Sequence, residues 1–182
     1  MTVLQGRLAD RDGWSAVGEC PIEKTMTAVG QKSAMLLMRE AYYGTTRFDD
    51  FSRRAGITKA ATSARLSELV GAGLLEKRPY RESGQRERQE YVLTPAGVDF
   101  MPVVWAMFEW GRTHLPGSAR LRLTHLRCDA DAHVEIVCEK GHSVSFDELG
   151  MRLARGGAES GPGRAKPHTE DDSGLSSSAF VS

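Results

Sequence analysis

The chain has 182 residues, of which 40% are hydrophobic and 26% charged, which is typical of one globular domain or of one domain plus an appendage. Its 24 basic residues balance 24 acidic ones, which argues against a histone-like polycation, and three cysteines are too few for a disulfide scaffold. No apolar stretch approaches the roughly 18 residues needed to span a bilayer, and the N-terminus lacks an apolar secretory region. We therefore expect a cytoplasmic protein.

Positive charge is concentrated in one window. Residues 53–88 hold 9 basic and 4 acidic side chains, a net charge of +5. Residues 1–19 carry a net charge of −1, and residues 116–182 carry −2. A short basic window of this kind is where a polyanion would bind.

Composition divides the chain into four parts. Residues 1–19 form a polar, flexible N-terminal arm, and residues 20–115 form the main folded block. A Pro-Gly-Ser break then precedes a small C-terminal extension at residues 121–155. Residues 156–182 are dominated by Gly, Ser, Pro and charge, which predicts a disordered tail.

Apolar periodicity predicts four helices in the first part of the main block. Pro21 suits the first turn of the first helix, which runs to about residue 29, and the second helix spans residues 34–43. The third helix begins at Arg47 and ends before a turn at residues 55–57. Thr58 then suits the N-cap of a fourth helix that runs to about residue 70.

A β-hairpin follows the fourth helix. Residues 74–80 and 88–93 alternate as strands and flank a polar, arginine-rich loop. Thr94, followed by a proline, predicts the start of a long helix that runs to about His114 and bends at Pro102. The order helix, turn, capped helix and hairpin predicts a winged helix-turn-helix, a mainly α fold with a β-hairpin wing.

Short sequence pieces in a fixed order span residues 20–111. They are Cys20-Pro21, Gly30-x-Lys32, Arg47-Phe48, Gly56-Ile57, Arg65-Leu66-x-x-Leu69, Gly73-Leu74, Tyr91-x-Leu93-Thr94-x-x-Gly97 and Trp110-Gly111. In order and spacing these pieces resemble the HxlR-type (MarR-like) transcriptional regulators. The sequence departs from that family at residues 30–33, which read Gly-Gln-Lys-Ser where the family usually has Gly-Gly-Lys-Trp.

The resemblance implies a homodimeric, sequence-specific DNA-binding regulator, often a repressor, that responds to a small molecule or a thiol-reactive signal. It also implies that the terminal helices of the block form the dimer interface. Val104, Trp105 and Phe108 of the last helix fit that interface, or alternatively the core of one monomer. The sequence lacks a Gly-rich phosphate loop, an HExxH motif and a nucleophile elbow, so we expect no enzyme. The alternative function is a winged-helix module that docks proteins without sequence-specific DNA binding.

The residues expected to touch DNA lie on the fourth helix and on the hairpin. Thr58, Lys59 and Ser63 are expected near base edges, because the N-terminal end of this helix enters the groove first. Arg65 is expected at a phosphate. A solvated charged loop is the alternative for the hairpin arginines. The full predicted set is Thr58, Lys59, Ser63, Arg65, Ser67, Arg81, Arg86 and Arg88.

Cys20 is a candidate redox sensor. It precedes the first helix, and a helix N-terminus favours the thiolate form of a cysteine. In many HxlR-type proteins the matching cysteine responds to oxidants, quinones or aldehydes. A small buried hydrophobe is the alternative.

The extension carries two pairs of residue types that bind zinc, His125-x-x-Cys128 and Cys138-x-x-x-His142. They predict a small zinc-ribbon-like unit that holds a structural zinc. The alternative is a ribbon without metal. We expect that the protein requires no cofactor for its function. We also expect a strand at residues 134–137 and a short amphipathic helix at residues 146–153.

Overall fold

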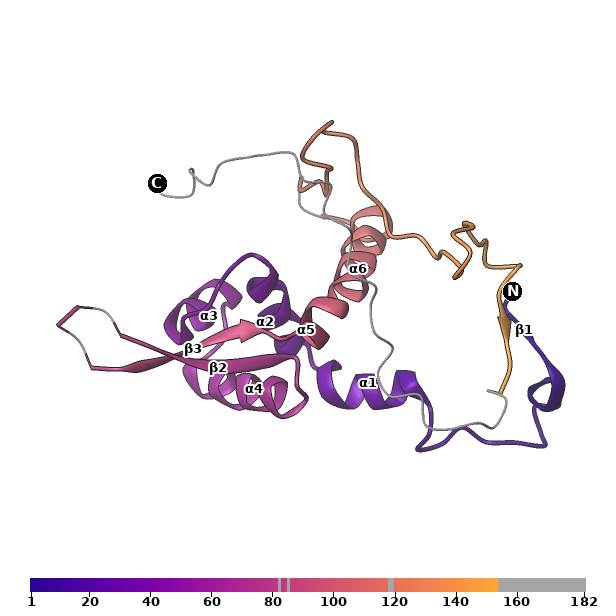
Figure 1. The fold of residues 1–182 in the computed structure, drawn as a ribbon, viewed down its shortest axis with the longest axis horizontal. Coiled ribbons are helices and arrows are strands. Elements are labelled where there is room, and N and C mark those ends of the chain that lie inside the picture. The colour runs from indigo at the N-terminus through magenta and orange to yellow at the C-terminus, as the bar shows by residue number, and fades with distance from the viewer. Residues whose placement is uncertain (82, 85, 118–119, 154–182) are drawn as a thin grey trace.

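The computed structural model describes residues 1–81, 83–84, 86–117 and 120–153, so the predicted tail at 156–182 lies outside the described residues. Helices α1 to α6 and one β-hairpin make up most of the described fold (Figure 1). The elements are β1 (Val3–Leu4), η1 (Gly6–Ala9), α1 (Pro21–Val29), α2 (Lys32–Tyr42), α3 (Phe48–Ala55), α4 (Lys59–Gly71), β2 (Leu75–Tyr80), β3 (Arg88–Leu93), α5 (Pro95–Asp99), α6 (Met101–His114) and β4 (Gly150–Met151).

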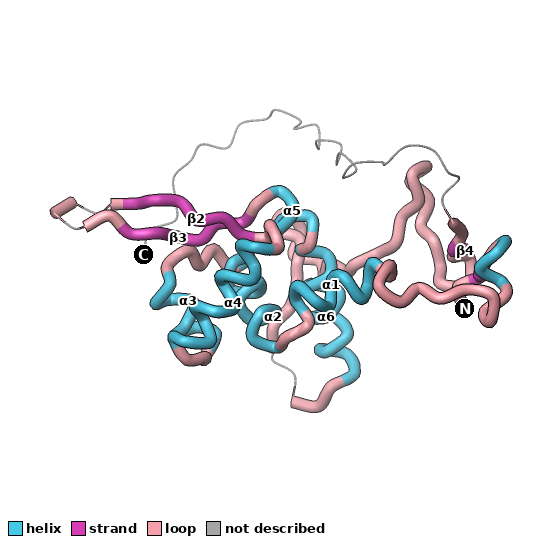
Figure 2. The backbone as a smooth tube through the Cα atoms, turned by 90° about the horizontal axis from the view of Figure 1, so that it is seen from below, coloured by secondary structure: helices cyan, strands magenta, loops and turns pink. Residues whose placement is uncertain are grey.

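The core lies among α2, α3 and α4, which group beside the hairpin (Figure 2). Its largest fully buried side chains come from these three helices and from the start of β2. Truncating one of the leucines to alanine would cost about 2–5 kcal/mol, because the transfer free energy is lost and a cavity remains. The apolar members of the set are Leu37, Met38, Phe51, Leu66, Leu69 and Leu75, and Thr62 is also fully buried.

The turn between α3 and α4 fixes the angle of the helix pair. Gly56 adopts a left-handed φ of +66°, which a side chain would disfavour. The Ile57 amide donates to the Ser52 carbonyl (3.2 Å), and the Ser52 hydroxyl donates to the Ile57 carbonyl (2.8 Å). The Thr58 hydroxyl then accepts from the Ala61 amide (3.2 Å). The predicted turn and N-cap are both confirmed.

The predicted hairpin is confirmed, and a further backbone segment, the one before α3, pairs with its edge. Strands β2 and β3 pair antiparallel, from Leu75 opposite Leu93 to Tyr80 opposite Arg88. The segment before α3 joins their edge, because the Tyr91 amide donates to the carbonyl of residue 46 (2.8 Å). The base of the hairpin is therefore tied to the start of the helix pair.

The prediction of one long helix after the hairpin was wrong, because the chain forms two separate helices there, α5 and α6. The predicted cap is confirmed, because the Thr94 hydroxyl accepts from the Gly97 amide (3.0 Å). Pro102 lies at the start of α6 rather than inside one bent helix. Proline has no amide hydrogen and its ring crowds the carbonyl four residues earlier, here that of Val98, so the first helix ends and a second begins.

The two ends of the described chain meet. β1 pairs parallel with β4, and the Val3 amide donates to the Leu149 carbonyl (2.7 Å). The helix predicted at 146–153 was therefore wrong, since this segment is a turn followed by β4. The Ser145 hydroxyl bonds the carboxylates of Asp147 and Glu148 (2.7 Å each), which stabilises a turn in competition with a helix.

Two tight turns make up much of the extension. An isolated bridge joins Thr124 to Asp131 around the first turn, and another joins Val137 to Ser143 around the second. The strand predicted at residues 134–137 was wrong, because only the second bridge involves this segment. Each turn carries one of the two predicted zinc-binding pairs.

Candidate nucleic-acid interface

One face of α4 is open to solvent. Thr58, Lys59, Ser63 and Ser67 are exposed on it. The opposite face packs into the core through the buried residues Thr62, Leu66 and Leu69. Spacings of four residues place Lys59, Ser63 and Ser67 on one line along the helix. This part of the predicted set thus forms a continuous polar stripe.

The Lys59 ammonium lies 2.8 Å from a carboxylate oxygen of Asp49, in the first turn of α3. The hydrogen bond and the charge of Lys59 hold the pKa of Asp49 below its ordinary value. Arg88 on β3 and Arg53 on α3 lower the pKa of Asp49 further through their charges. Three cations from three elements therefore act on one carboxylate, which places α3, the start of α4 and the hairpin on one surface, called here the Asp49 surface.

Arg65 differs from the other α4 candidates. Its side chain is only 18% exposed, and its guanidinium pairs with Glu68 at 2.5 Å. A phosphate would have to replace Glu68 as its partner. Arg65 thus remains a predicted phosphate contact, but it is less accessible than Lys59.

The hairpin arginines Arg81, Arg86 and Arg88 are all exposed. The loop between β2 and β3 projects away from the helices, at the left of Figure 1. Arg88 lies on β3 opposite Tyr80, and its charge acts on Asp49. Arg88 therefore lies at the strand end of the wing, while Arg81 and Arg86 lie in the loop beyond the paired strands.

Arg47 supports the base of this wing, a role that the sequence analysis missed. Its guanidinium lies 3.1 Å from the centroid of the Tyr80 ring and 3.8 Å from a carboxylate oxygen of Glu90. Backbone pairing also joins residue 47 to residue 90. Arg53 and Asp49 were missed as well. The Arg47 contacts and the Lys59–Asp49 pair join different elements, so the spacing of residues carried no signal for them. Asp49 and Arg53 lie four residues apart on α3, and that spacing could have indicated their interaction.

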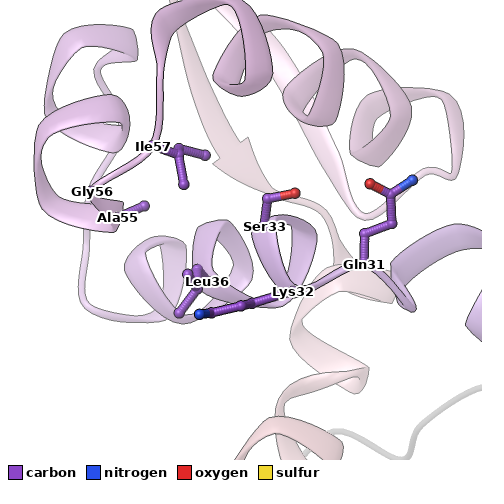
Figure 3. Close-up of a pocket in the computed structure, with 7 residues that line it drawn as sticks. All are labelled: Gln31, Lys32, Ser33, Leu36, Ala55, Gly56 and Ile57. Atoms are coloured by element: carbon purple, nitrogen blue, oxygen red, sulfur yellow. The ribbon is translucent and has the colours of Figure 1, made fainter.

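A hollow of about 550 Å³ lies beside the helix pair (Figure 3). Gln31, Lys32 and Ser33 line it from the start of α2, and Gly56 and Ile57 line it from the turn before α4. None of the predicted DNA-contact residues lines this hollow. It therefore lies behind the α3–α4 turn rather than in the polar stripe of α4.

Cys20 occupies the N-cap position of α1 and is half-buried. Its side chain makes no capping hydrogen bond, whereas its backbone carbonyl accepts from the Lys24 amide (3.0 Å). All three cysteines are free thiols. The geometry agrees with the predicted position at a helix start, and the sensing role stays a prediction.

The predicted zinc ligands form two separate pairs. The Nδ1 atom of His125 lies 3.1 Å from the Sγ atom of Cys128. Across the second turn, the Cys138 amide donates to the His142 carbonyl (2.9 Å). Within the described residues, no group of three or more His, Cys, Asp or Glu side chains is placed to hold a metal ion. A zinc shared by both pairs stays a prediction, and it requires the two turns to approach each other.

Among the described helices, none is both long enough and apolar enough to cross a membrane.

Comparison with known proteins assigns helices α2 to α6 and the hairpin to a family. The model of the HxlR-like helix-turn-helix family matches residues 28–119. An HTH-type transcriptional regulator of Mycobacterium tuberculosis (strain H37Rv) is 34% identical over 119 residues, which are 64% of this chain and 74% of the relative. The regulator YybR of Bacillus subtilis is 31% identical over 96 residues, which cover 52% of this chain and 75% of the relative.

Two solved structures share the fold. The structure of PA1607, described as a transcription factor, matches with a TM-score of 0.65 and 28% identity, over 78% of this chain and 98% of that chain. PA1374 of Pseudomonas aeruginosa, also described as a transcription factor, matches with a TM-score of 0.56 and 31% identity, over 77% of this chain and 96% of that one. The predicted winged helix-turn-helix fold is thereby confirmed. The chain belongs to the HxlR-like helix-turn-helix family and is a transcriptional regulator of the helix-turn-helix type.

Proposed function

We propose that the protein is a homodimeric repressor that binds an inverted-repeat operator and acts in the cytoplasm. The observation that carries the DNA-binding part of this proposal is the exposed polar stripe of α4, whose Lys59 lies 2.8 Å from Asp49 of α3. Phosphates that line a groove would meet Lys59 together with the exposed Arg53 and Arg88, whose charges also act on Asp49. No cofactor is required for this function.

The polar stripe of α4 enters the major groove in this proposal. Lys59, Thr58 and Ser63 lie at its leading end, where contacts with base edges are made. The wing arginines, including Arg86, approach phosphates or the adjacent minor groove. Because the Lys59 ammonium pairs with the Asp49 carboxylate in the free protein, a group on the DNA must replace Asp49 as its partner.

Dimerisation is supported by an exposed apolar stripe on α6. Val103, Met107 and Trp110 are 45–58% exposed, and Leu115 follows directly after the helix at 53%. Spacings of three and four residues keep the three helical side chains on one face. An adjacent face of α6 packs inward through the buried Val104.

Trp105 and Phe108 also contribute to the packing of one chain. The ring of Trp105 lies 6.0–6.3 Å from the rings of Tyr42 and Tyr43, and 6.0 Å from that of Phe108. The structure thus favours the monomer-core alternative for Trp105 and Phe108. The candidate dimer face therefore consists of the exposed side chains beside them on α6, such as Val103.

The signal in this proposal is a small molecule or a thiol-reactive compound. Cys20 lies at the start of α1, and α1 exposes Ile22 and Met26 beside it. A modified thiol at this position would change the packing of α1. Because α1 contacts both α2 and α4, such a change can reach the DNA-binding helix.

The test is a genome-wide DNA selection with the purified full chain, in reducing and in oxidising buffer. We expect an inverted repeat whose half-sites lie about one or two helical turns apart, as a dimer requires. Loss of binding only in the oxidising arm would support the thiol signal. No enriched sequence in either arm would contradict the proposal and favour a protein-docking module.

A further inference from the structure

The outer part of the wing, which comprises β2, β3 and the loop between them, lies outside the hydrophobic core. The core reaches the base of the hairpin through Leu75, Tyr91 and Leu93. Beyond that base, residues 76–79 on β2 and 88–89 on β3 are all exposed, and the loop projects away from the helices (Figure 1). A two-stranded hairpin is only marginally stable by itself, so contacts with other elements have to hold its outer part in one orientation.

Arg47 contacts both strands of the wing at once. Its backbone pairs with that of Glu90 on β3, and its guanidinium lies 3.1 Å from the centroid of the Tyr80 ring on β2. The same guanidinium lies 3.8 Å from a carboxylate oxygen of Glu90. Arg47, Tyr80 and Glu90 are called here the wing clamp. Because Tyr80 is the last residue of β2, the wing clamp acts at the outer end of the paired strands.

The chemistry of arginine suits the wing clamp. A guanidinium is planar and stacks on an aromatic face, while its edge still presents N–H donors to a carboxylate. Lysine carries the same charge without the planar surface, so it cannot reproduce the stacking. The side chains of Arg47 and Glu90 are 35% and 24% exposed, which shields their contact partly from water. The wing clamp therefore requires an arginine and an aromatic ring rather than any cation.

The start of α3 connects the wing to α4 through two nearby residues. Arg47 is the N-cap residue of α3 and holds the wing. Asp49, two residues later, lies 2.8 Å from the Lys59 ammonium at the start of α4. The wing and the leading end of α4 are thus joined through the first turn of one helix, and this connection determines how far apart they lie.

This separation matters for DNA binding because α4 and the wing have to meet different parts of the duplex at the same time. Contacts with phosphates fix the register and orientation of a protein on DNA. A wing that is already ordered also loses less conformational freedom on binding than a mobile one. The orientation of the wing therefore affects affinity through the exposed Arg81 and Arg86 of its loop, even where Arg47 does not touch DNA.

We propose that Arg47 is a positioning residue for DNA binding, because the wing clamp holds Arg81 and Arg86 where they reach DNA while α4 occupies the groove. This inference rests on the DNA-binding function proposed above. Loss of the wing clamp keeps α4 and both loop arginines in the protein but releases the angle between them. Affinity should then fall although no residue that contacts DNA has been changed.

Affinity for the selected operator, measured by fluorescence anisotropy with the full chain, gives the first test. We expect Arg47→Ala and Tyr80→Ala each to weaken binding at least about fivefold. The double variant should bind no more weakly than either single variant, because both remove the same contact. Arg47→Lys should lose as much as Arg47→Ala, whereas Tyr80→Phe keeps the ring and should bind as the unmodified protein does.

Unchanged binding by Tyr80→Ala, together with weaker binding by Arg47→Ala, would overturn the proposal, because Arg47 would then act without the wing clamp. Tyr80 lies outside the core cluster, so Tyr80→Ala should fold even if Arg47→Ala does not. Thermal unfolding followed by circular dichroism checks the folding of each variant.

A photo-crosslink from the wing loop reports the position of the wing directly. Ser83→Cys, in a full chain whose three native cysteines are changed to serine, carries an azidophenacyl group at an exposed position of the loop. We expect Arg47→Ala or Tyr80→Ala to weaken its crosslinks to the operator or to spread them over neighbouring nucleotides. Crosslinks from the matched probe Ser63→Cys on α4 should keep their positions.

Two outcomes of the crosslinking would overturn the proposal and leave DNA binding standing. Equal losses from the probes at residues 83 and 63 would mean that Arg47 supports the whole fold. An unchanged pattern from residue 83 would mean that the wing clamp does not set the position of the wing. Absence of specific DNA binding by the unmodified protein would overturn both this proposal and the proposed function.

Discussion

Substitution of Lys59 is the sharpest perturbation of the proposed interface. Lys59→Ala removes one ammonium from the Asp49 surface and leaves Asp49 without its nearest cation at 2.8 Å. On an isolated operator we expect a loss of about 1–3 kcal/mol for each contact removed, on the order of five- to 150-fold in affinity. A dimer carries two copies of Lys59, so two such contacts are lost at each operator and the total loss is about twice as large, roughly 2–6 kcal/mol.

The salt dependence of DNA affinity gives a second measurable test of the Lys59 contact. Each phosphate contact contributes about −0.9 to the slope of log affinity against log salt concentration. If both Lys59 ammonium groups neutralise phosphates, Lys59→Ala should make the slope shallower by about 1.8. If they contact base edges instead, affinity should fall with a smaller change in slope. Fluorescence anisotropy with the selected operator between about 50 and 200 mM salt measures both quantities.

The matched control is Lys24→Ala. Lys24 also forms an exposed ion pair, with Glu19 at 2.9 Å, but it lies on α1 outside the Asp49 surface. We expect this variant to bind as the unmodified protein does. Equal losses for Lys24→Ala and Lys59→Ala, or no loss for Lys59→Ala, would refute the placement of α4 on DNA.

Four further predictions follow from named contacts. Asp49→Asn should tighten DNA binding about two- to fivefold in the same anisotropy assay, because an exposed ion pair is weak and its removal frees Lys59; weaker binding would contradict this. Lys59→Ala should also raise the pKa of Asp49 toward its ordinary value in an NMR titration. The stabilisation from that pair is present above the unfolded pKa and is lost as pH falls through the depressed folded pKa. Gly97→Ala should lower the free energy of unfolding in urea by about 1–3 kcal/mol or more, because the new Cβ would clash with the Leu74 carbonyl oxygen. If Cys20 is the sensor, the Cys20→Ser variant should keep DNA binding in diamide while the unmodified protein loses it. Loss of binding in both the variant and the unmodified protein would rule out Cys20 as the sensor.

The sequence predicted the fold well wherever local chemistry determines structure. The N-caps at Thr58 and Thr94 and the turn at Gly56 are set by residues within a few positions, and each was found as predicted. The sequence predicted a bend at Pro102, but the structure has a complete break there between α5 and α6. Whether a proline bends a helix or ends it depends on the packing around it, and the sequence pattern does not contain that packing.

Contacts between distant segments were beyond the reach of the sequence pattern. The pairing of β1 with β4 joins the two ends of the described chain, and the stacking of Arg47 on Tyr80 joins α3 to the wing. Neither contact leaves a periodic or local signature. On the candidate interface, the pattern identified Lys59 and Arg88 as cations, and only the structure showed that Lys59 pairs with Asp49 of α3.

A DNA crosslink from α4 tests the central claim most directly. Ser63→Cys, in a full chain whose three native cysteines are changed to serine, carries an azidophenacyl group at an exposed position of the polar stripe. On the selected operator we predict crosslinks to bases within each half-site, symmetric about the centre of the repeat. Specific binding without any crosslink from this position, alongside efficient crosslinking from a probe in the N-terminal arm such as Val17→Cys, would contradict the account.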